Sequence, residues 1–255
     1  MPNQHEDLPS VSIIIPTYNS AHTIIETLEG VFKQDVTMEV IVMNDASTDE
    51  TLKILEAYQD KIKVFSAEKN QGVAASRYQG IRHATHDWIA FCDSDDVWKE
   101  GKLRHQLKVC LETKAVLCAT ARELMDEHGV SLHRIIEVYD IITYEDLLKT
   151  NSINNSSILM KKEVAMDVPL FNSSLHEDYL MWLTILKKYH IARGINIPYV
   201  RYRVSSSSKS GNKLKSAIMH FRTQRAFKLP LYKVVLNMIP YTYHGFKKHG
   251  RLKKK

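Results

Sequence analysis

The sequence predicts an α/β protein with a doubly wound, mostly parallel central sheet. Over roughly the first hundred residues, short apolar runs alternate with segments whose apolar residues recur at helical spacing. Each apolar run also ends in polar residues, as expected of parallel strands whose ligands bind beyond their carboxyl ends. A chain of 255 residues, 44% apolar and 25% charged, is long enough for one such domain and an appendage.

The first half of the chain predicts four strands and three helices. Residues 11–15 form a nearly continuous β-branched run that Pro16 stops, which is typical of a strand buried on both faces. A helix from about Ala21 leads to a strand at 39–43 that ends in Asn44 and Asp45. The expected elements that follow are a helix capped by residues 47–50, a weaker strand at 63–65, a loop at 68–72, a helix at 73–83 and a strand at 88–92.

The second half predicts a mixed set of elements. In order, we expect a helix at 99–112, a strand at 115–120, a hairpin over 122–139 that turns at 127–129, a short helix from 143, a polar loop from 151, a strand at 157–160, a helix that opens with Glu177 and Asp178, a strand at 194–203 and a polar Ser-rich loop at 205–211. The acids of the helix opening at Glu177 are either functional or simply favoured by the helix dipole.

The strand at 88–92 ends in three carboxylates within four positions, namely Asp93, Asp95 and Asp96. Their mutual repulsion and desolvation are unfavourable by several kcal/mol unless a cation offsets them. Asp93 and Asp95 are two positions apart, so on continued strand geometry they point the same way and can share one hard cation with diphosphate oxygens. The alternative is a solvated acidic turn that caps the helix starting near Lys99.

Two other strand ends favour the nucleotide-site interpretation of this acidic turn. Residues 17–19 and Asp45 lie at carboxyl ends that a parallel sheet brings to the same edge. No GxGxxG follows the first strand and no GxxxxGK[ST] occurs, so neither dinucleotide binding nor a P-loop is supported. A diphosphate would therefore need a metal in place of a glycine-rich cradle.

The net charge of +6 hides a strong asymmetry along the chain. Residues 1–178 carry 17 Lys and Arg against 29 Asp and Glu, whereas residues 179–255 carry 18 against none. From residue 212 the chain is amphipathic, aromatic-rich and basic, which predicts contact with an anionic membrane surface. The alternative is a C-terminal helix packed on the domain with a solvated lysine tail. No nucleic-acid-binding signature is present.

Three observations bear on where the protein works. Cys92, Cys110 and Cys118 are odd in number and form no CxxC pair, which suits a reducing cytoplasm rather than a disulfide framework or a zinc site. The polar, acidic residues 1–10 are not expected to be a signal peptide. No run of about 18 apolar residues occurs, so we expect a cytoplasmic protein, peripheral on the inner face of the membrane.

Five segments in this order resemble the family 2 glycosyltransferases of GT-A fold, over about residues 11 to 205: 11–19 (VSIIIPTYN), 44–49 (NDASTD), 70–77 (NQGVAASR), 93–96 (DSDD) and 176–183 (HEDYLMWL). The resemblance implies inverting transfer from a nucleoside-diphosphate sugar, with UDP expected, and a divalent Mn or Mg ion. It further implies a lipid-linked or polysaccharide acceptor in cell-surface glycan synthesis. Residues 202–204 (YRV), the Ser-rich stretch after them, Asn212-Lys213 and the basic aromatic tail resemble bacterial cell-wall and capsule enzymes of the teichuronic-acid type.

The resemblance also implies roles for individual residues. Those of the nucleotide pocket are Pro16, Thr17, Asn19, Asp45, Asn70, Gly72, Arg77 and Asp93, with Asp45 on the uracil N3–H and Asp93 on the ribose. Asp95 is the expected direct metal ligand, helped by Asp93. Asp178, with Glu177 beside it, is the expected general base that deprotonates the acceptor hydroxyl, and Trp182 and Ser157 are expected on the acceptor side.

The chain departs from the family pattern at three places. Asn44-Asp45-Ala46-Ser47 stands where many members have Asp-Asp-Gly-Ser, and Tyr78 stands where an Asn is common. Many members place a metal-reaching His after the stretch that corresponds to Tyr202-Arg203, where this chain has Ser205 or a neighbour. The third metal contact is therefore open.

Other classes fit the residues less well. A phosphatase of the haloacid-dehalogenase type has an Asp-x-Asp pair like that of residues 93–95, but on its first strand and with a later Gly-Asp-x-x-x-Asp. A sugar-nucleotide pyrophosphorylase needs a Gly-rich loop where this chain has 16–19. The non-enzyme alternative is a degenerate domain that binds a nucleotide sugar or a membrane without turnover.

The expected division of the chain is an N-terminal tail at 1–10, a nucleotide-binding half at 11–98, an acceptor-binding half at 99–211 and a basic extension at 212–255.

Overall fold

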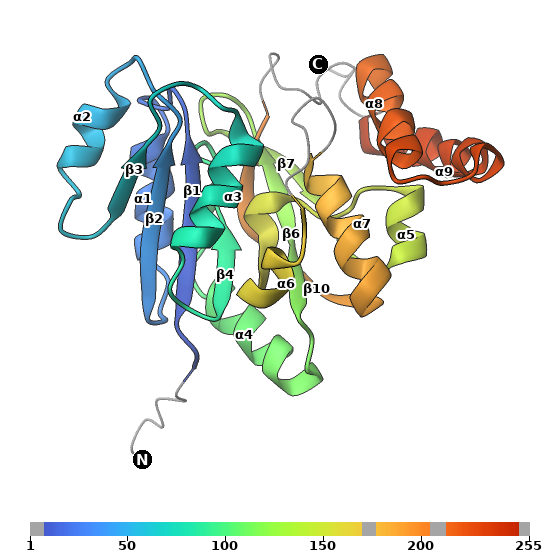
Figure 1. The fold of residues 1–255 in the computed structure, drawn as a ribbon, viewed down its shortest axis with the longest axis horizontal. Coiled ribbons are helices and arrows are strands. Elements are labelled where there is room, and N and C mark those ends of the chain that lie inside the picture. Colours follow the sequence, from blue (N-terminus) through green and yellow to red (C-terminus); the bar gives the residue numbers. More distant parts are fainter. Residues whose placement is uncertain (1–7, 170–176, 205–212, 250–255) are drawn as a thin grey trace.

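A single ten-stranded sheet forms the centre of the protein, with helices on both of its faces (Figure 1). The computed structural model describes residues 8–169, 177–204 and 213–249, and for 213–216 and 243–249 only the backbone. The main path of the sheet runs β3-β2-β1-β4-β9-β6-β10-β5, with β7 paired to β6 and β8 to β10. The α/β architecture expected from the sequence is confirmed.

The N-terminal half of the sheet is entirely parallel. β1 (Val11–Thr17) lies between β2 (Met38–Asn44) and β4 (Trp88–Phe91), and β3 (Lys63–Ser66) forms the edge beside β2. The connecting helices are α1 (Ile24–Phe32), α2 (Thr51–Glu56) and α3 (Val73–His83). This is the predicted order of elements, and it brings the carboxyl ends of β1, β2 and β4 to one edge.

The second half of the sheet is mixed. β9 (Ile158–Lys161) is antiparallel to both β4 and β6 (Leu117–Met125), whereas the long β10 (Ile191–Arg203) runs parallel to β6. The antiparallel partners β7 (Ser131–Ile136), β8 (Ile141–Thr143) and β5 (Val97–Trp98) complete it. The predicted hairpin over 122–139 corresponds to β6, β7 and the turn between them.

Two hydrophobic cores cover the two faces of the sheet. On β1, Ile14 packs with residues of α3, α6 (Lys162–Met166) and α7 (Glu177–Tyr189), whereas Ile13 and Ile15 pack with residues of α1, α2 and α4 (Lys102–Thr113). Alternate residues of a strand point to opposite faces, so a strand covered on both sides reads as a continuous apolar run. All seven residues of β1 are buried.

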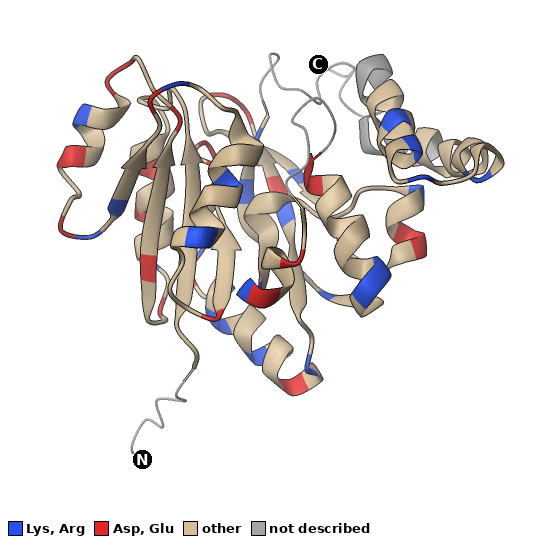
Figure 2. Ribbon diagram, viewed as in Figure 1, with Lys and Arg blue, Asp and Glu red and all other residues tan. Residues whose placement is uncertain are grey.

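The basic extension is helical, as predicted. α8 (Lys213–Ala226) and α9 (Leu231–His249) pack against each other, and α9 also contacts α5 (Tyr144–Lys149). Figure 2 shows Lys and Arg but no Asp or Glu along the coloured parts of α8 and α9. Among the helices that the structure describes, none combines the length and the apolar character needed to cross a membrane.

Candidate active site

A hollow of about 630 Å³ lies at the carboxyl ends of β1, β2 and β4. Its walls come from the β1–α1 loop, the end of β2, the start of α3, the acidic turn after β4, the β6–β7 turn, the start of α7 and the end of β10. The lining residues are Pro16, Thr17, Tyr18, Asn19, Ser20, His22, Thr23, Asp45, Val73, Ser76, Arg77, Asp93, Ser94, Asp95, Glu127, Glu177 and Arg203. The three strand ends predicted to converge therefore do so around one hollow.

Side chains of the β1–α1 loop join the three strand ends to one another. The Oδ1 atom of Asn19 accepts a hydrogen bond of 2.8 Å from the backbone N–H of Thr48, which follows β2. Asn19 itself has a φ of 49°, in the left-handed region that Asn tolerates better than most residues. The hydroxyls of Ser20 and Ser94 lie 2.8 Å apart and fix the same loop to the acidic turn.

Asp45 binds the loop that starts α3. Its two carboxylate oxygens accept hydrogen bonds of 2.7 Å from the backbone N–H groups of Gln71 and Gly72. Gly72 has a φ of 89°, which a residue with a Cβ adopts only under strain. Asp45 thus sets the position of α3, and with it that of Arg77. The Asp45 side chain also lines the hollow.

The acidic turn is held from below by a short helical turn, η1 (Asn155–Ser157). The backbone N–H of Asp93 donates to Ser156 Oγ at 3.0 Å, and the indole N–H of Trp98 donates to the Ser156 carbonyl at 2.8 Å. Asp96 is fully buried and its Oδ1 accepts from the backbone N–H of Arg203 at 3.0 Å. Asp95 is the exposed member of the three carboxylates.

Arg203, at the end of β10, joins the acidic turn to the opposite wall. Its Nε donates to the carbonyl of Asp95 at 2.9 Å, and its Nη1 donates to the carbonyl of Glu127, in the β6–β7 turn, at 3.0 Å. Its Nη2 pairs with Glu26 of α1 at 2.6 Å. One guanidinium therefore connects α1, the acidic turn and the β6–β7 turn.

Arg77 of α3 bridges the two acidic parts of the site. Its Nη2 lies 2.5 Å from Asp93 Oδ1, and its Nη1 lies 3.3 Å from Glu177 Oε1 at the start of α7. With its amide oxygen turned to the guanidinium, Asn155 accepts from both terminal nitrogens at 3.1 Å. Burial alone would lower the pKa of Arg77, but Asp93 and Glu177 outweigh burial and raise it.

The carboxylates of the acidic turn do not share the same protonation behaviour. Although Asp95 is the most solvent-accessible residue of the three, desolvation by the protein around its carboxylate, followed by the negative charge of Asp93, raises its pKa to about 6. Burial and the neighbouring Asp95 raise the pKa of Asp96 well above its usual value. The negative charges of Asp93 and Asp95 are therefore crowded together, and a cation bound in the hollow can reach the Asp95 carboxylate.

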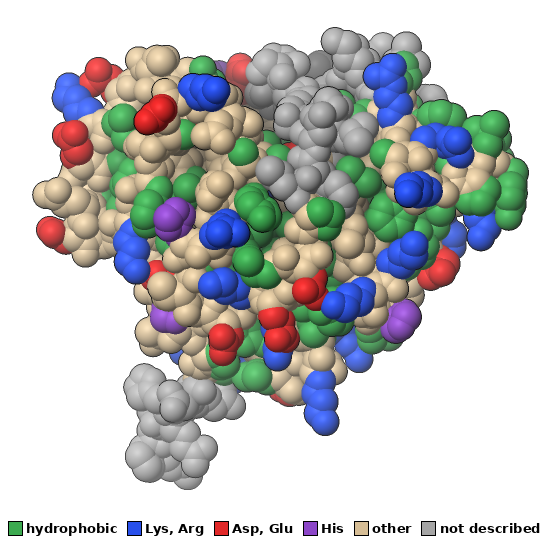
Figure 3. Space-filling model, in the orientation of Figure 1, with side chains coloured by type: hydrophobic (Ala, Val, Ile, Leu, Met, Phe, Trp, Pro, Cys, Tyr) green, Lys and Arg blue, Asp and Glu red, His purple; other side chains and the backbone are tan. Residues whose placement is uncertain are grey.

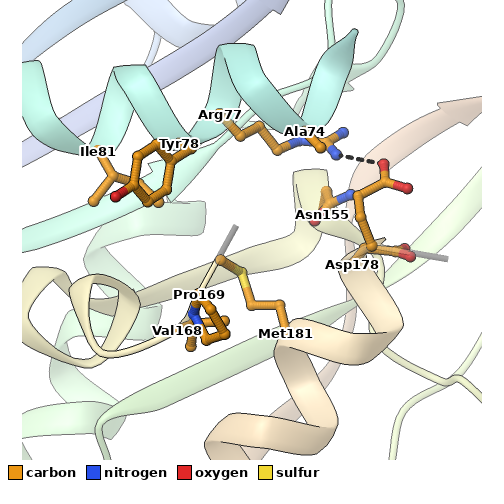
Figure 4. A pocket seen from close by; sticks show the side chains of 10 residues that line it. Ala74, Arg77, Tyr78, Ile81, Asn155, Val168, Pro169, Asp178 and Met181 are labelled. Carbon is orange, nitrogen blue, oxygen red and sulfur yellow. Dashed lines mark hydrogen bonds and ion pairs between the residues drawn. The ribbon is translucent and has the colours of Figure 1, made fainter. Parts of the chain in front are cut away.

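A smaller cavity adjoins the site between α3 and α7 (Figure 4). Met181 of α7 faces Tyr78 and Ile81 of α3 across it, and Arg77, Asn155 and Asp178 lie at one end. Glu177 lines both this cavity and the large hollow, whereas Asp178 lines the smaller one. Asp178 Oδ1 accepts from the backbone N–H of Tyr179 at 2.7 Å, so the carboxylate caps its own helix.

Residues 12–167 match the family model described as glycosyl transferase family 2. This chain belongs to glycosyltransferase family 2. Relatives agree with the assignment. The teichuronic acid biosynthesis glycosyltransferase TuaG of Bacillus subtilis is 34% identical over 213 residues, covering 82% of this chain and 84% of the relative. An Escherichia coli UDP-Glc:alpha-D-GlcNAc-diphosphoundecaprenol beta-1,3-glucosyltransferase, WfgD, is 32% identical over 246 residues, covering 94% of this chain and 95% of that one.

Two solved structures resemble the fold. S. aureus TarS in complex with UDP-GlcNAc superposes with a TM-score of 0.70 at 21% identity, covering 96% of this chain and 76% of that one. The mannosyltransferase PcManGT from Pyrobaculum calidifontis, in complex with GDP-Man and Mn2+, gives a TM-score of 0.67 at 19% identity, covering 92% and 70%. At these identities the likeness concerns the fold, which is GT-A-like as the sequence predicted.

Most of the residues expected to bind the nucleotide lie together around the large hollow. Pro16, Thr17, Asn19, Asp45, Arg77 and Asp93 all line the large hollow. Asn70 and Gly72 are not among its lining residues: Asn70 is exposed, and Gly72 acts through its N–H to Asp45. The specific roles of these residues stay predictions.

The two expected acceptor residues have packing roles in this family member. The indole of Trp182 is fully buried in the core beneath α7. Ser157 is also fully buried, and its hydroxyl donates to the carbonyl of Asn154 at 2.6 Å. Neither side chain lines the hollow or the smaller cavity, so contact of either with an acceptor stays a prediction.

The metal expected for the family was tested against the residues present. Among the residues that the structure describes, no group of three or more His, Cys, Asp and Glu side chains is arranged to hold a metal ion. Asp95 remains a fitting hard-cation ligand, because its carboxylate is exposed beside Asp93. Asp93 is engaged by Arg77, and Ser205, the candidate for a third contact, lies outside the described residues.

Sequence reasoning missed several residues of the site, among them Arg203, Glu127, Asn155 and Ser156. Arg203 was visible only as part of a family pattern, since nothing in a strand end shows which carbonyl its guanidinium will meet. Glu127 lies in the β6–β7 turn, and the position of this turn at the hollow depends on the pairing of β10 with β6. Asn155 and Ser156 belong to a polar loop without a motif that indicates their buried partners.

Proposed function

We propose that this protein transfers a sugar, with inversion, from a UDP-sugar to a hydroxyl of a lipid-linked or polysaccharide acceptor in the synthesis of a bacterial cell-surface glycan. The relatives named above act in teichuronic acid biosynthesis or use a UDP-Glc donor and a diphosphoundecaprenol acceptor, according to their descriptions. One observation carries the proposal. A single hollow is lined by Asp45, the end of β1, the acidic turn, Arg77 and Glu177.

Different residues of the hollow would bind different parts of the donor. Pro16, Thr17, Asn19 and Asp45 line the part of the hollow in which the base of the donor would lie. Asp95, with Asp93, would hold a Mn or Mg ion, completed by diphosphate oxygens and water. When bound, that ion supplies charge neutralisation for the diphosphate leaving group.

The start of α7 supplies the acid–base group. Asp178 would accept the proton of the acceptor hydroxyl, which turns a weak nucleophile into a competent one. Asp178 lies in the first turn of α7. Glu177 is held by Arg77 in the position next to it. The protein works peripherally on the inner face of the cell membrane, where a lipid-linked acceptor is presented.

Calorimetric titration of UDP in the presence of Mn and then EDTA tests the donor site. We expect binding that needs the metal and is lost in Asp95→Ala, while Asp60→Ala, a change of an exposed acid in the α2–β3 connection, leaves it intact. Absence of UDP binding under every condition would overturn the uridine assignment.

The role of α7 is tested by transfer from UDP-sugars in the Asp178→Asn variant. We expect kcat to fall by at least about 100-fold with UDP affinity unchanged, because general-base catalysis contributes about 10²–10⁴-fold. A variant that retains full transfer would remove Asp178 from the mechanism.

A further inference from the structure

The outward side of α9 carries five large apolar side chains in contact with solvent. Leu231, Tyr232, Val235, Leu236 and Ile239 are each between 52% and 65% exposed. At 100° per residue these positions fall within an arc of about 140° on the helix. Val234, on the opposite side, is fully buried against the rest of the protein. We call these five side chains the α9 apolar face, and contiguous exposed apolar groups of this kind usually mark an interaction surface.

The surroundings of the α9 apolar face are basic. Arg222, Arg225, Lys228 and Lys233 are exposed on α8, α9 and the turn between them. Residues 179–255 contain no Asp or Glu at all. In Figure 3, green side chains lie at the edge of the molecule formed by α9, with blue side chains beside them. The partner that fits is therefore apolar and anionic together.

Buried contacts fix α9 to the catalytic part of the protein. The ring of His220 of α8 stacks between Tyr179 of α7 and Tyr241 of α9, with centroid distances of 4.9 and 4.0 Å. Gln224 of α8 donates to the carbonyl of Leu148 at 2.8 Å and accepts from Asn237 of α9 at 3.0 Å. Figure 1 shows both helices at the same end of the molecule as the carboxyl ends of the parallel strands.

We propose that the α9 apolar face docks the protein on the surface of an anionic phospholipid bilayer. The apolar side chains would enter the boundary between headgroups and acyl chains, and the basic side chains would contact lipid phosphates. A second copy of this chain is a poorer occupant, because two strongly basic surfaces would face each other. The inference deepens the proposed function, on which it rests for the lipid-linked acceptor, by naming the surface that brings the hollow to the membrane.

Sedimentation with lipid vesicles tests this surface. The probes are vesicles of phosphatidylglycerol and phosphatidylethanolamine, with phosphatidylcholine vesicles as the neutral comparison. The test variant is Leu236→Gln with Ile239→Gln, and the matched control is Leu52→Gln with Leu111→Gln, two leucines of α2 and α4 that are 37% and 48% exposed. Circular dichroism and thermal unfolding check that all proteins fold, which exposed substitutions on helices allow.

We expect the unmodified protein and the control to bind anionic vesicles, with binding that weakens as salt rises. The test variant should bind at least about tenfold more weakly, because two large apolar side chains no longer leave water. Lys228→Glu with Lys233→Glu should weaken anionic binding by about tenfold or more and leave the weak binding to neutral vesicles unchanged.

Two outcomes would overturn the proposal. The first is equal vesicle binding by the test variant and the control. The second is a dimer in light scattering that the test variant dissociates, without vesicle binding by any form, since a second copy would then cover the face. UDP titration of the same samples separates this surface from the proposed function: vesicle binding without UDP binding or transfer from UDP-sugars would leave the surface standing and reject the proposed UDP-sugar donor.

Discussion

Arg77 and Asp93 form an ion pair of 2.5 Å that joins α3 to the end of β4, and both residues line the large hollow. The same guanidinium reaches Glu177, so one buried cation positions acids from two distant parts of the chain. Asp93 is thereby held by a protein cation on one side while its neighbour Asp95 faces the hollow. The two acids of the Asp-x-Asp pair consequently have different surroundings.

Replacement of Arg77 should lower the stability of the protein strongly. We expect Arg77→Gln to lower the free energy of unfolding by about 3–5 kcal/mol, because it leaves partly buried carboxylates without their partner. Arg77→Lys should be intermediate, since an ammonium group cannot match the planar guanidinium at both acids. Urea unfolding measures both, with Arg82→Gln, an exposed position of the same helix, as the control. Equal effects at positions 77 and 82 would show that the bridge contributes nothing to stability.

Glu39 gives the protein a stability dependence at acidic pH. Its carboxylate accepts from Ser12 and Thr85 and pairs with Lys63 at 2.8 Å. Burial acts to raise its pKa, but these partners outweigh burial and lower the pKa from 4.5 to about 2. Because the folded pKa is below the unfolded one, the stabilisation is complete above about pH 4.5 and is lost as the pH falls towards 2.

We therefore expect Glu39→Gln to lower the free energy of unfolding by on the order of 1–3 kcal/mol at pH 7. The difference from the unmodified protein should shrink between pH 4.5 and pH 2. Urea unfolding at a series of pH values measures it. Glu50→Gln is the matched control, because the Glu50–Lys53 pair is largely exposed. A difference that stays constant with pH would contradict the assignment.

Lys102 gives the protein a second pH dependence of stability, of the same sign, at neutral to alkaline pH. This side chain is fully buried, with its ammonium 3.9 Å from the centre of the Trp98 ring and 2.9 Å from Gln106 Oε1. Burial lowers its pKa from 10.5 to about 7. The unfolded chain therefore binds more protons between these values, so the native state gains stability as the pH rises from about 7 towards 10.5.

Lys102→Met should remove that gain. Relative to the unmodified protein, the variant should be most stable near pH 7 and lose its advantage as the pH rises, by on the order of a few kcal/mol over the window. Chemical unfolding between pH 6 and about pH 10 measures the difference, with the exposed Lys33→Met as the control. The hypothesis fails if the two variants show the same pH dependence.

The parallel half of the fold could be predicted because its signals are local. The run at 11–15 needs burial on both faces, and the polar residues after each strand mark the edge to which a parallel sheet brings them. The convergence of Asn19, Asp45 and Asp93 around one hollow follows from that order alone.

The mixed half could not be predicted to the same depth. The insertion of β9 between β4 and β6 depends on pairings between residues far apart in the chain. The same holds for Arg203, whose three partners come from three different elements. Trp182 is one turn of helix beyond Asp178, a spacing that places both on one side of α7 without showing that the indole lies in the core.

Gln224 should decide whether the C-terminal helices stay docked. Its amide is fully buried and satisfies both the Leu148 carbonyl and Asn237. Gln224→Ala leaves these two groups without partners, which is unfavourable by about 1–3 kcal/mol for each buried group. Because the lost contacts lie between α8 and its neighbours rather than within the sheet, we expect limited proteolysis to cut α8 and α9 several-fold faster while residues 8–169 stay protected. The Arg222→Ala variant, changed at an exposed position of the same helix, should be cut at the same rate as the unmodified protein. If Gln224→Ala is cut no faster than Arg222→Ala, apolar packing of α9, not this amide, holds the extension in place.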